Sequence, residues 1–184
     1  METSFGNHSS RLANRSDGVS TESGAVRVRK AGWLATALLT LAGCSDSLAE
    51  ANRLVESGLV AARQEQYEKA YELFAQAERI HPGFTPAMVA SGELAIDLGE
   101  YDRADADLSR AIALDPHIME WREKRATVRQ LAGRYDESLS DYDAVIAVQP
   151  ENSAALYNRG ALLALRGNKA AAAADLERAF RVEQ

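Results

Sequence analysis

The stretch that decides the fold is TPAMVASGELAIDLGEYDRADADLSRAIALDPHI, residues 85–118. Its proline near the end, Pro116, has counterparts 34 residues away on either side, at Pro82 and Pro150. Small residues and large apolar residues recur in the same register over residues 51–184. A constant spacing of 34 residues predicts copies of one structural unit that bury their apolar faces by stacking on one another.

Each unit is predicted to contain two antiparallel helices. If the repeated proline is position 32, the helices cover about positions 1–14 and 17–30 of the unit, with a turn at position 15. Gly99, Gly133 and Gly167 occupy position 15, where a residue with positive φ readily ends a helix. Glu65 stands there in the first unit and indicates the turn less clearly. No stretch alternates with period two, so no strands are expected.

The helix ends follow from proline and from capping residues. Asp115-Pro116 and Gln149-Pro150 are expected to end the second helices, because proline cannot continue a helix. Thr85 is expected to be an N-cap that precedes a proline at the first helical position. Ser153 is expected to cap the first helix of the last unit.

The repeated positions carry a recognisable packing pattern. Position 8 holds a small residue in every unit, namely Gly58, Gly92, Ala126 and Gly160. Position 24 holds a large apolar residue, namely Phe74, Leu108, Tyr142 and Leu176. With the proline at position 32, the pattern resembles the tetratricopeptide repeat. The resemblance implies an all-α, right-handed α-solenoid of about four units, covering residues 51–84, 85–118, 119–152 and 153–184.

The resemblance also implies a function in binding a protein partner, whose identity the sequence does not give. In this family the groove face is formed by positions 2, 5, 6, 9, 12 and 13 of the first helix of each unit. The residues that we predict to bind a partner are Asn52, Val55, Glu56, Val89, Glu93, Asp97, Lys124, Thr127, Tyr157 and Asn158. Family members that hold the C-terminal carboxylate of chaperones use a Lys/Arg and Asn clamp, which the first two units lack, so that ligand is not expected.

The third unit carries an arginine-rich segment that has two interpretations. It contains Arg122, Lys124, Arg125, Arg129 and Arg134. One interpretation is a docking site for an acidic partner segment. The other, which we favour, is ion pairing with neighbouring acids, namely Glu120, Glu123, Asp136 and Glu137. The acid pairs Glu137/Asp141 and Asp102/Asp105 are expected to lie on solvated helix faces.

The N-terminal region resembles the signal of a bacterial lipoprotein. A basic segment with Arg27, Arg29 and Lys30 precedes the apolar residues 31–42, which are fewer than the about 20 needed to span a bilayer. Leu41-Ala42-Gly43-Cys44 then resembles the lipobox of that family, which implies a signal peptide over 27–43 and a lipid on Cys44. Residues 44–50 would form a tether from the membrane to the array.

The polar residues 1–26 are expected to be a disordered leader or the result of a misassigned start. In many bacterial lipoproteins, aspartate directly after the lipidated cysteine retains the protein in the inner membrane. Ser45 stands there in this chain, so the resemblance implies the outer membrane facing the periplasm. The resulting hypothesis is a lipid-anchored scaffold that assembles or positions a complex of the cell envelope. The alternative is a cytosolic adaptor or co-chaperone that keeps residues 1–50 as an uncleaved tail.

Several classes of function are not expected from this sequence. The net charge is −6, and the chain from Cys44 onward has 16 basic and 24 acidic residues, a net charge of −8, which argues against nucleic acid as a partner. His81 and His117 lie beside repeat prolines and His8 lies in the leader, so no metal site is expected. Without a phosphate-binding loop or a nucleophile motif, we expect no enzyme and no cofactor.

The last unit suggests self-association. Solenoids usually end in a polar capping helix, because the last unit otherwise exposes its stacking face. Here the last predicted helix carries Leu176 and Phe180, and Phe180 aligns with Ile112 and Ile146 of the preceding units. An uncovered Phe180 would be available to a partner or to a second copy of the chain.

Overall fold

A computed structural model describes residues 46–182 of the chain. The predicted leader 1–26, the predicted signal 27–43 and the predicted lipidation site Cys44 lie outside the described residues. The described part contains eight helices and no strand, as the sequence predicts. The helices are residues 46–63, α2 (Tyr67–Ile80), α3 (Thr85–Asp97), α4 (Tyr101–Leu114), α5 (Met119–Leu131), α6 (Tyr135–Val148), α7 (Ser153–Leu165) and α8 (Lys169–Val182).

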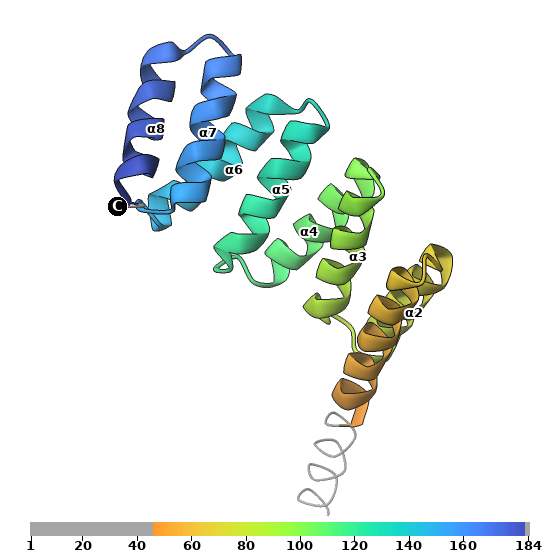
Figure 1. The fold of residues 1–184 in the computed structure, drawn as a ribbon. Coiled ribbons are helices and arrows are strands. Elements are labelled where there is room, and N and C mark those ends of the chain that lie inside the picture. Colours follow the sequence, from red (N-terminus) through yellow and green to blue (C-terminus); the bar gives the residue numbers. More distant parts are fainter. Residues whose placement is uncertain (1–45, 183–184) are drawn as a thin grey trace, which may run out of the picture. The chain divides into compact units, whose positions relative to one another are not determined.

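Consecutive helices pair into four antiparallel hairpins, each of which packs against the next along the chain (Figure 1). The core lies inside the hairpins and at their junctions, and most of its side chains come from the apolar and small positions of the repeat. Buried residues of the first hairpin and of α3 form one cluster that includes Phe74, Phe84 and Leu94. A second hairpin is therefore required to bury the apolar face of the first, as expected for a stacked array.

The small residue at position 8 allows the two helices of a hairpin to approach closely. A Cβ atom added to Gly58 would lie 2.5 Å from Cε1 of Phe74. One added to Gly160 would lie 3.0 Å from Cγ of Leu176. The residues at positions 8 and 24 therefore pack directly on each other, which explains why a small residue always opposes a large one.

The turns inside the hairpins share one backbone conformation. Gly99, Gly133 and Gly167 have φ angles of 73°, 77° and 83°, as the sequence predicts. Glu65 has a φ angle of 58°, so the first turn keeps the left-handed conformation even though its residue carries a Cβ atom. The amides of Glu65 and Gln66 donate to the carbonyls of Ala62 and Ala61, which is the same pattern as at Gly99, so the first turn closes like the glycine turns.

Two helix caps differ from the sequence expectation by one residue. Phe84, not Thr85, is the N-cap of α3, and it makes no side-chain capping bond. Asn152, not Ser153, caps α7, since its Oδ1 accepts a hydrogen bond of 2.8 Å from the amide of Ala155. The extended backbone of Asn152 directs its side chain at the third helical amide, which leaves Ser153 inside the first turn.

The second helices end where the sequence predicts. The α4 helix ends at Leu114, directly before Asp115-Pro116, and α6 ends at Val148, directly before Gln149-Pro150. None of the helices in residues 46–182 is long and apolar enough to cross a bilayer.

Candidate functional site

The structure places most of the predicted groove residues at the surface of the first helices. Asn52, Glu56, Asp97, Thr127 and Tyr157 are exposed, and Val89, Glu93, Lys124 and Asn158 are half-buried. Val55 is the exception, because it is buried among Ala51 and Phe74 in the first core cluster. Its side chain is therefore part of the hairpin core and is not accessible to a partner.

The early part of the groove face contains a hollow of about 350 Å³. It lies among the helix over residues 46–63, α2 and α3, and is lined by Leu59, Ala62, Arg63, Tyr67, Phe74, Ala90, Glu93, Leu94, Asp97 and Leu98. Its lining is mainly apolar, whereas Arg63, Glu93 and Asp97 supply the charged groups. Within the described residues, Arg63 and Asp97 form no ion pair, so both charges are available to a ligand.

The middle of the groove face is occupied by contacts inside the protein. Lys124 of α5 forms ion pairs with Glu93 of α3 and, at 3.4 Å, with Glu120. Burial alone would lower the pKa of Lys124, but the hydrogen bond from its ammonium group to Glu93 raises that pKa above its usual value. The side chain of Thr127 is hydrogen-bonded within the protein as well, since its hydroxyl lies 3.0 Å from the hydroxyl of Tyr142.

The late part of the groove face is an exposed apolar stripe on α7. Tyr157 and Leu165 are 60% and 65% exposed, and Ala161 and Ala164 between them are exposed as well. The four residues stand at intervals of four, three and one, which places them on one side of the helix. The opposite side of α7 packs into the core through Ala155, Leu156, Gly160 and Leu162.

Sequence reasoning missed two apolar residues of the groove face. Leu131 of α5 and Leu165 of α7 are both exposed, and both occupy position 13 of their units. The same position carries the charged Arg63 and Asp97 in the first two units. The groove face therefore changes along the array from a charged rim to an apolar one, and the position-13 residues signal this change in the sequence.

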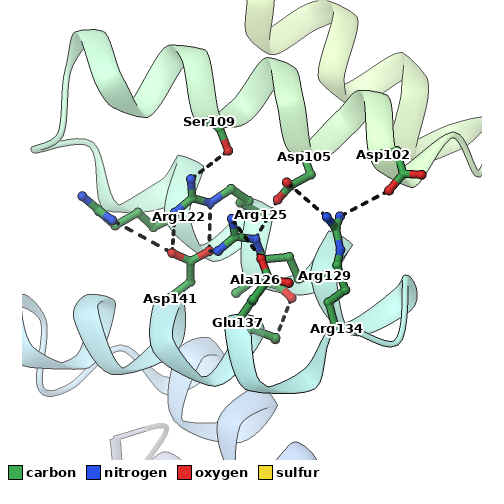
Figure 2. Close-up of polar contacts among 11 residues, drawn as sticks. Asp102, Asp105, Ser109, Arg122, Arg125, Ala126, Arg129, Arg134, Glu137 and Asp141 are labelled. Carbon is green, nitrogen blue, oxygen red and sulfur yellow. Dashed lines mark hydrogen bonds and ion pairs between the residues drawn. The ribbon is translucent and has the colours of Figure 1, made fainter.

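The arginine-rich segment of the third unit is ion-paired inside the protein (Figure 2). Asp141 of α6 accepts bonds of 2.9 and 2.6 Å from Nε and Nη2 of Arg125, and one of 2.9 Å from Nη1 of Arg129. Arg129 also donates from Nε to Asp105 of α4 at 2.7 Å. The favoured interpretation, ion pairing, is therefore confirmed.

The partners of these arginines differ in part from those expected. Asp141 is only 3% exposed and Asp105 is half-buried, so the prediction that they lie on solvated helix faces is wrong. Asp141 is covered because positions 7 and 23 of one unit face each other across the hairpin, 16 residues apart in the chain. Asp105 is covered by Arg129 of the next hairpin. Of the expected acids, Glu137 pairs with Arg129 at 3.6 Å and Glu120 pairs with Lys124.

The same pairing recurs in other hairpins. Arg159 donates two bonds of 2.7 Å to Asp175 and one of 2.7 Å to Asp143 of the preceding hairpin. In the second unit the equivalent contact joins Ser91 to Asp107 at 2.6 Å. The hydrogen bonds with Asp175 raise the pKa of Arg159, as those with Asp141 raise the pKa of Arg125. These arginines join helices and are not free to dock an acidic partner.

The histidines of the described part lie in the turns between hairpins. The ring of His81 meets that of Phe84 edge-on, with 5.7 Å between centroids, and its Nδ1 lies 3.4 Å from the Ser47 hydroxyl. The amide of His117 donates to Asp115. Over residues 46–182, no group of three or more His, Cys, Asp or Glu side chains is placed to hold a metal ion.

Comparison with known proteins identifies the repeat. Residues 61–122 and 124–182 each match a family model described as tetratricopeptide repeat. A TPR repeat-containing protein of Rhizobium etli is 38% identical over 61 residues, which are 33% of this chain and 30% of that protein. Tetratricopeptide repeat protein 6 of Homo sapiens is 24% identical over 123 residues, 65% of this chain and 24% of that protein. The chain thus spans less than a third of the length of either relative.

Solved structures share the fold. YrrB, described as a TPR protein with an unusual peptide-binding site, matches with a TM-score of 0.63 and 26% identity, covering 72% of this chain and 68% of YrrB. MamA matches with a TM-score of 0.67 and 20% identity, covering 72% of this chain and 78% of MamA. At that identity the likeness to MamA concerns the fold alone.

Proposed function

We propose that this chain, which belongs to the tetratricopeptide repeat family over residues 61–122 and 124–182, binds a segment of a partner protein along its groove face. The observation that carries the proposal is the exposed apolar stripe of Tyr157, Ala161, Ala164 and Leu165 on α7. An exposed apolar surface of this kind is typical of an interaction site. The peptide-binding site described for the similar protein YrrB supports the proposal.

The chemistry of the groove face indicates the kind of segment that it would bind. The hollow of about 350 Å³ offers an apolar lining to one bulky side chain. Arg63 and Asp97 beside it would pair with an acidic and a basic group of the same segment. The apolar stripe on α7 would cover further apolar residues. An amphipathic segment with apolar anchors and a few charges therefore fits better than a strongly acidic or basic one.

A photo-crosslinking experiment tests the binding face. A photoreactive phenylalanine analogue replaces Tyr157 in the full chain, expressed in its native host, and captured peptides are identified by mass spectrometry. We expect the same partner segment to be captured in repeated experiments. The matched control is the analogue at Val148, which is as exposed as Leu165 but ends the second helix α6. Equal capture from both sites, or none from Tyr157, would contradict the proposal.

We further propose that the array is held at a bacterial membrane by a lipid on Cys44 and positions components of an envelope complex. The support is the order of basic residues, apolar residues 31–42 and Leu41-Ala42-Gly43-Cys44 in the sequence. Several acyl chains on one residue would anchor the chain more firmly than the marginal binding of a single chain. The competing proposal is a cytosolic adaptor that keeps residues 1–50.

Intact mass separates these two proposals. Protein purified from the native host with detergent should have the mass of a chain that begins at Cys44 with acyl groups attached. The Cys44→Ala variant should lose the lipid mass and leave the membrane fraction. An unmodified wild-type chain that keeps residues 1–43 in the soluble fraction would refute the lipid anchor and leave the proposal on the groove face untouched.

A further inference from the structure

We infer that the two ends of the array are complementary, so that the last hairpin of one copy packs onto the first hairpin of another. This inference goes beyond the proposed function, because the contact involves the stacking faces of the hairpins and not the groove face. Copies of the chain would then associate head to tail. The argument starts from the junctions between hairpins inside one chain.

Each internal junction brings together the same positions of neighbouring units. Position 24 of one unit shares a core cluster with position 10 of the next, as Phe74 does with Leu94 and Leu108 does with Val128. At position 28, Ile146 of α6 is buried in one cluster with Leu156 of α7. At each junction we call the surface of the earlier hairpin that carries positions 24 and 28 the leaving side. The surface of the following hairpin that carries position 10 is called the receiving side.

The last hairpin has a leaving side without a receiver in the described chain. Phe180 at position 28 is 65% exposed, whereas Ile112 and Ile146 at the same position are 5% and 7% exposed. Leu176 at position 24 is half-buried, whereas Leu108 is fully buried. Both differences have one cause, which is that no hairpin covers α8 as α5 covers α4 and α7 covers α6.

The first hairpin has the matching receiving side. Val60 at position 10 is 48% exposed, whereas its equivalents Leu94, Val128 and Leu162 are buried. A hollow of about 490 Å³ lies beside it, lined by Glu56, Ser57, Val60, Ala61, Gln64, Lys69 and Leu73. Leu73 stands at position 23, where the later units carry an aspartate, so this end is more apolar than an internal receiving side.

These observations identify the occupant as a second copy of this chain. At two internal junctions a position-24 side chain and a position-10 side chain of this sequence lie in one buried cluster. In the register of the internal junctions, Leu176 at position 24 would enter the hollow beside Val60. Phe180 at position 28 would lie against Leu54 at position 4, as Ile146 lies in one cluster with Leu156. A contact between two different faces is heterologous, and it can continue from copy to copy as an open chain.

Two single variants of the full chain test the arrangement. Val60→Glu places a charge on the receiving side only, and Phe180→Glu places one on the leaving side only. Both positions are exposed, so circular dichroism melts should match that of the wild type. Light scattering after size exclusion, over a hundredfold range of concentration, then gives the mass of each variant and of an equimolar mixture.

Head-to-tail association predicts different masses for the wild type, for each variant and for their mixture. The wild type should grow in mass with concentration beyond that of a dimer, and each variant alone should stay monomeric. The equimolar mixture should form a dimer of twice the monomer mass, because each variant keeps one intact face. Dimers of Val60→Glu alone would instead indicate contact between two like ends and would overturn the inference. A monomeric wild type over the whole concentration range would overturn it as well.

Discussion

The ion pairs around Asp141 give the strongest prediction on stability. Asp141→Asn keeps the shape of the side chain but removes the charge that faces Arg125 and Arg129. Three hydrogen bonds of 2.6–2.9 Å to guanidinium groups would be lost or weakened. Both arginines are mostly buried, with side-chain exposures of 13% and 14%, so solvent would not replace the lost partner well.

The magnitude follows from the contacts that remain. Removing one partner of a buried ion pair usually costs about 3–5 kcal/mol. Arg125 keeps a bond of 2.8 Å to Ser109 and Arg129 keeps its bond of 2.7 Å to Asp105, so the lower end of that range applies. We therefore expect the free energy of unfolding to fall by about 3 kcal/mol and the melting temperature by about 10 °C for a domain of this size.

Thermal unfolding followed by circular dichroism checks this value. The matched control is Asp102→Asn, which removes a charge of the same kind from a fully exposed side chain 3.8 Å from Arg134. That change should leave the melting temperature close to that of the wild type, as surface substitutions usually do. The expected loss of about 3 kcal/mol would be refuted if Asp141→Asn melted within 2 °C of the wild type. It would also be refuted if this variant melted no lower than the control.

Further predictions concern the tight positions of the hairpins, each measured as the free energy of unfolding in urea. Gly58→Ala should destabilise by about 1–3 kcal/mol because its Cβ would lie 2.5 Å from the ring of Phe74. Gly92→Ala should instead be neutral or stabilise by up to about 1 kcal/mol, since the nearest atom is 3.4 Å away and alanine favours the helix. Glu65→Gly should stabilise by about 0.5–1 kcal/mol by relieving the positive φ. Equal effects of Gly58→Ala and Gly92→Ala would refute the closer contact between positions 8 and 24 in the first hairpin.

Much of the fold could be predicted from the sequence because the same residue types recur at the same positions of each unit. Glycines at position 15 require the left-handed turn, and prolines at position 32 prevent the second helices from continuing. Position 8 opposes position 24 in hairpin after hairpin, so the sequence alone indicates which faces meet. The N-caps were displaced by one residue, since the backbone at Asn152 and not the residue type alone decides which side chain reaches the amides.

The candidate site was predicted less completely. The groove residues were predicted from their positions in the first helix of each unit. Nine of the ten predicted residues are at least partly accessible in the structure. Burial of Val55 could not be read from its position, because the other units carry the half-buried Val89 and Glu123 and the exposed Tyr157 there. Whether a position belongs to the groove or to the core depends on how its own helix rotates against its neighbours.

The period, the hairpins, their turns and the apolar residues that hold them together can be predicted from the sequence, because these depend on residues close in the chain or repeated along it. Which acid pairs with which arginine depends on how distant helices pack. Arg129 reaches Asp105 of α4 and Asp141 of α6, which lie 24 and 12 residues away on two different helices. The tertiary structure also leaves Val60 exposed while Leu94, Val128 and Leu162 at the same position are buried, since burial depends on whether a neighbouring hairpin is present and not on the residue itself.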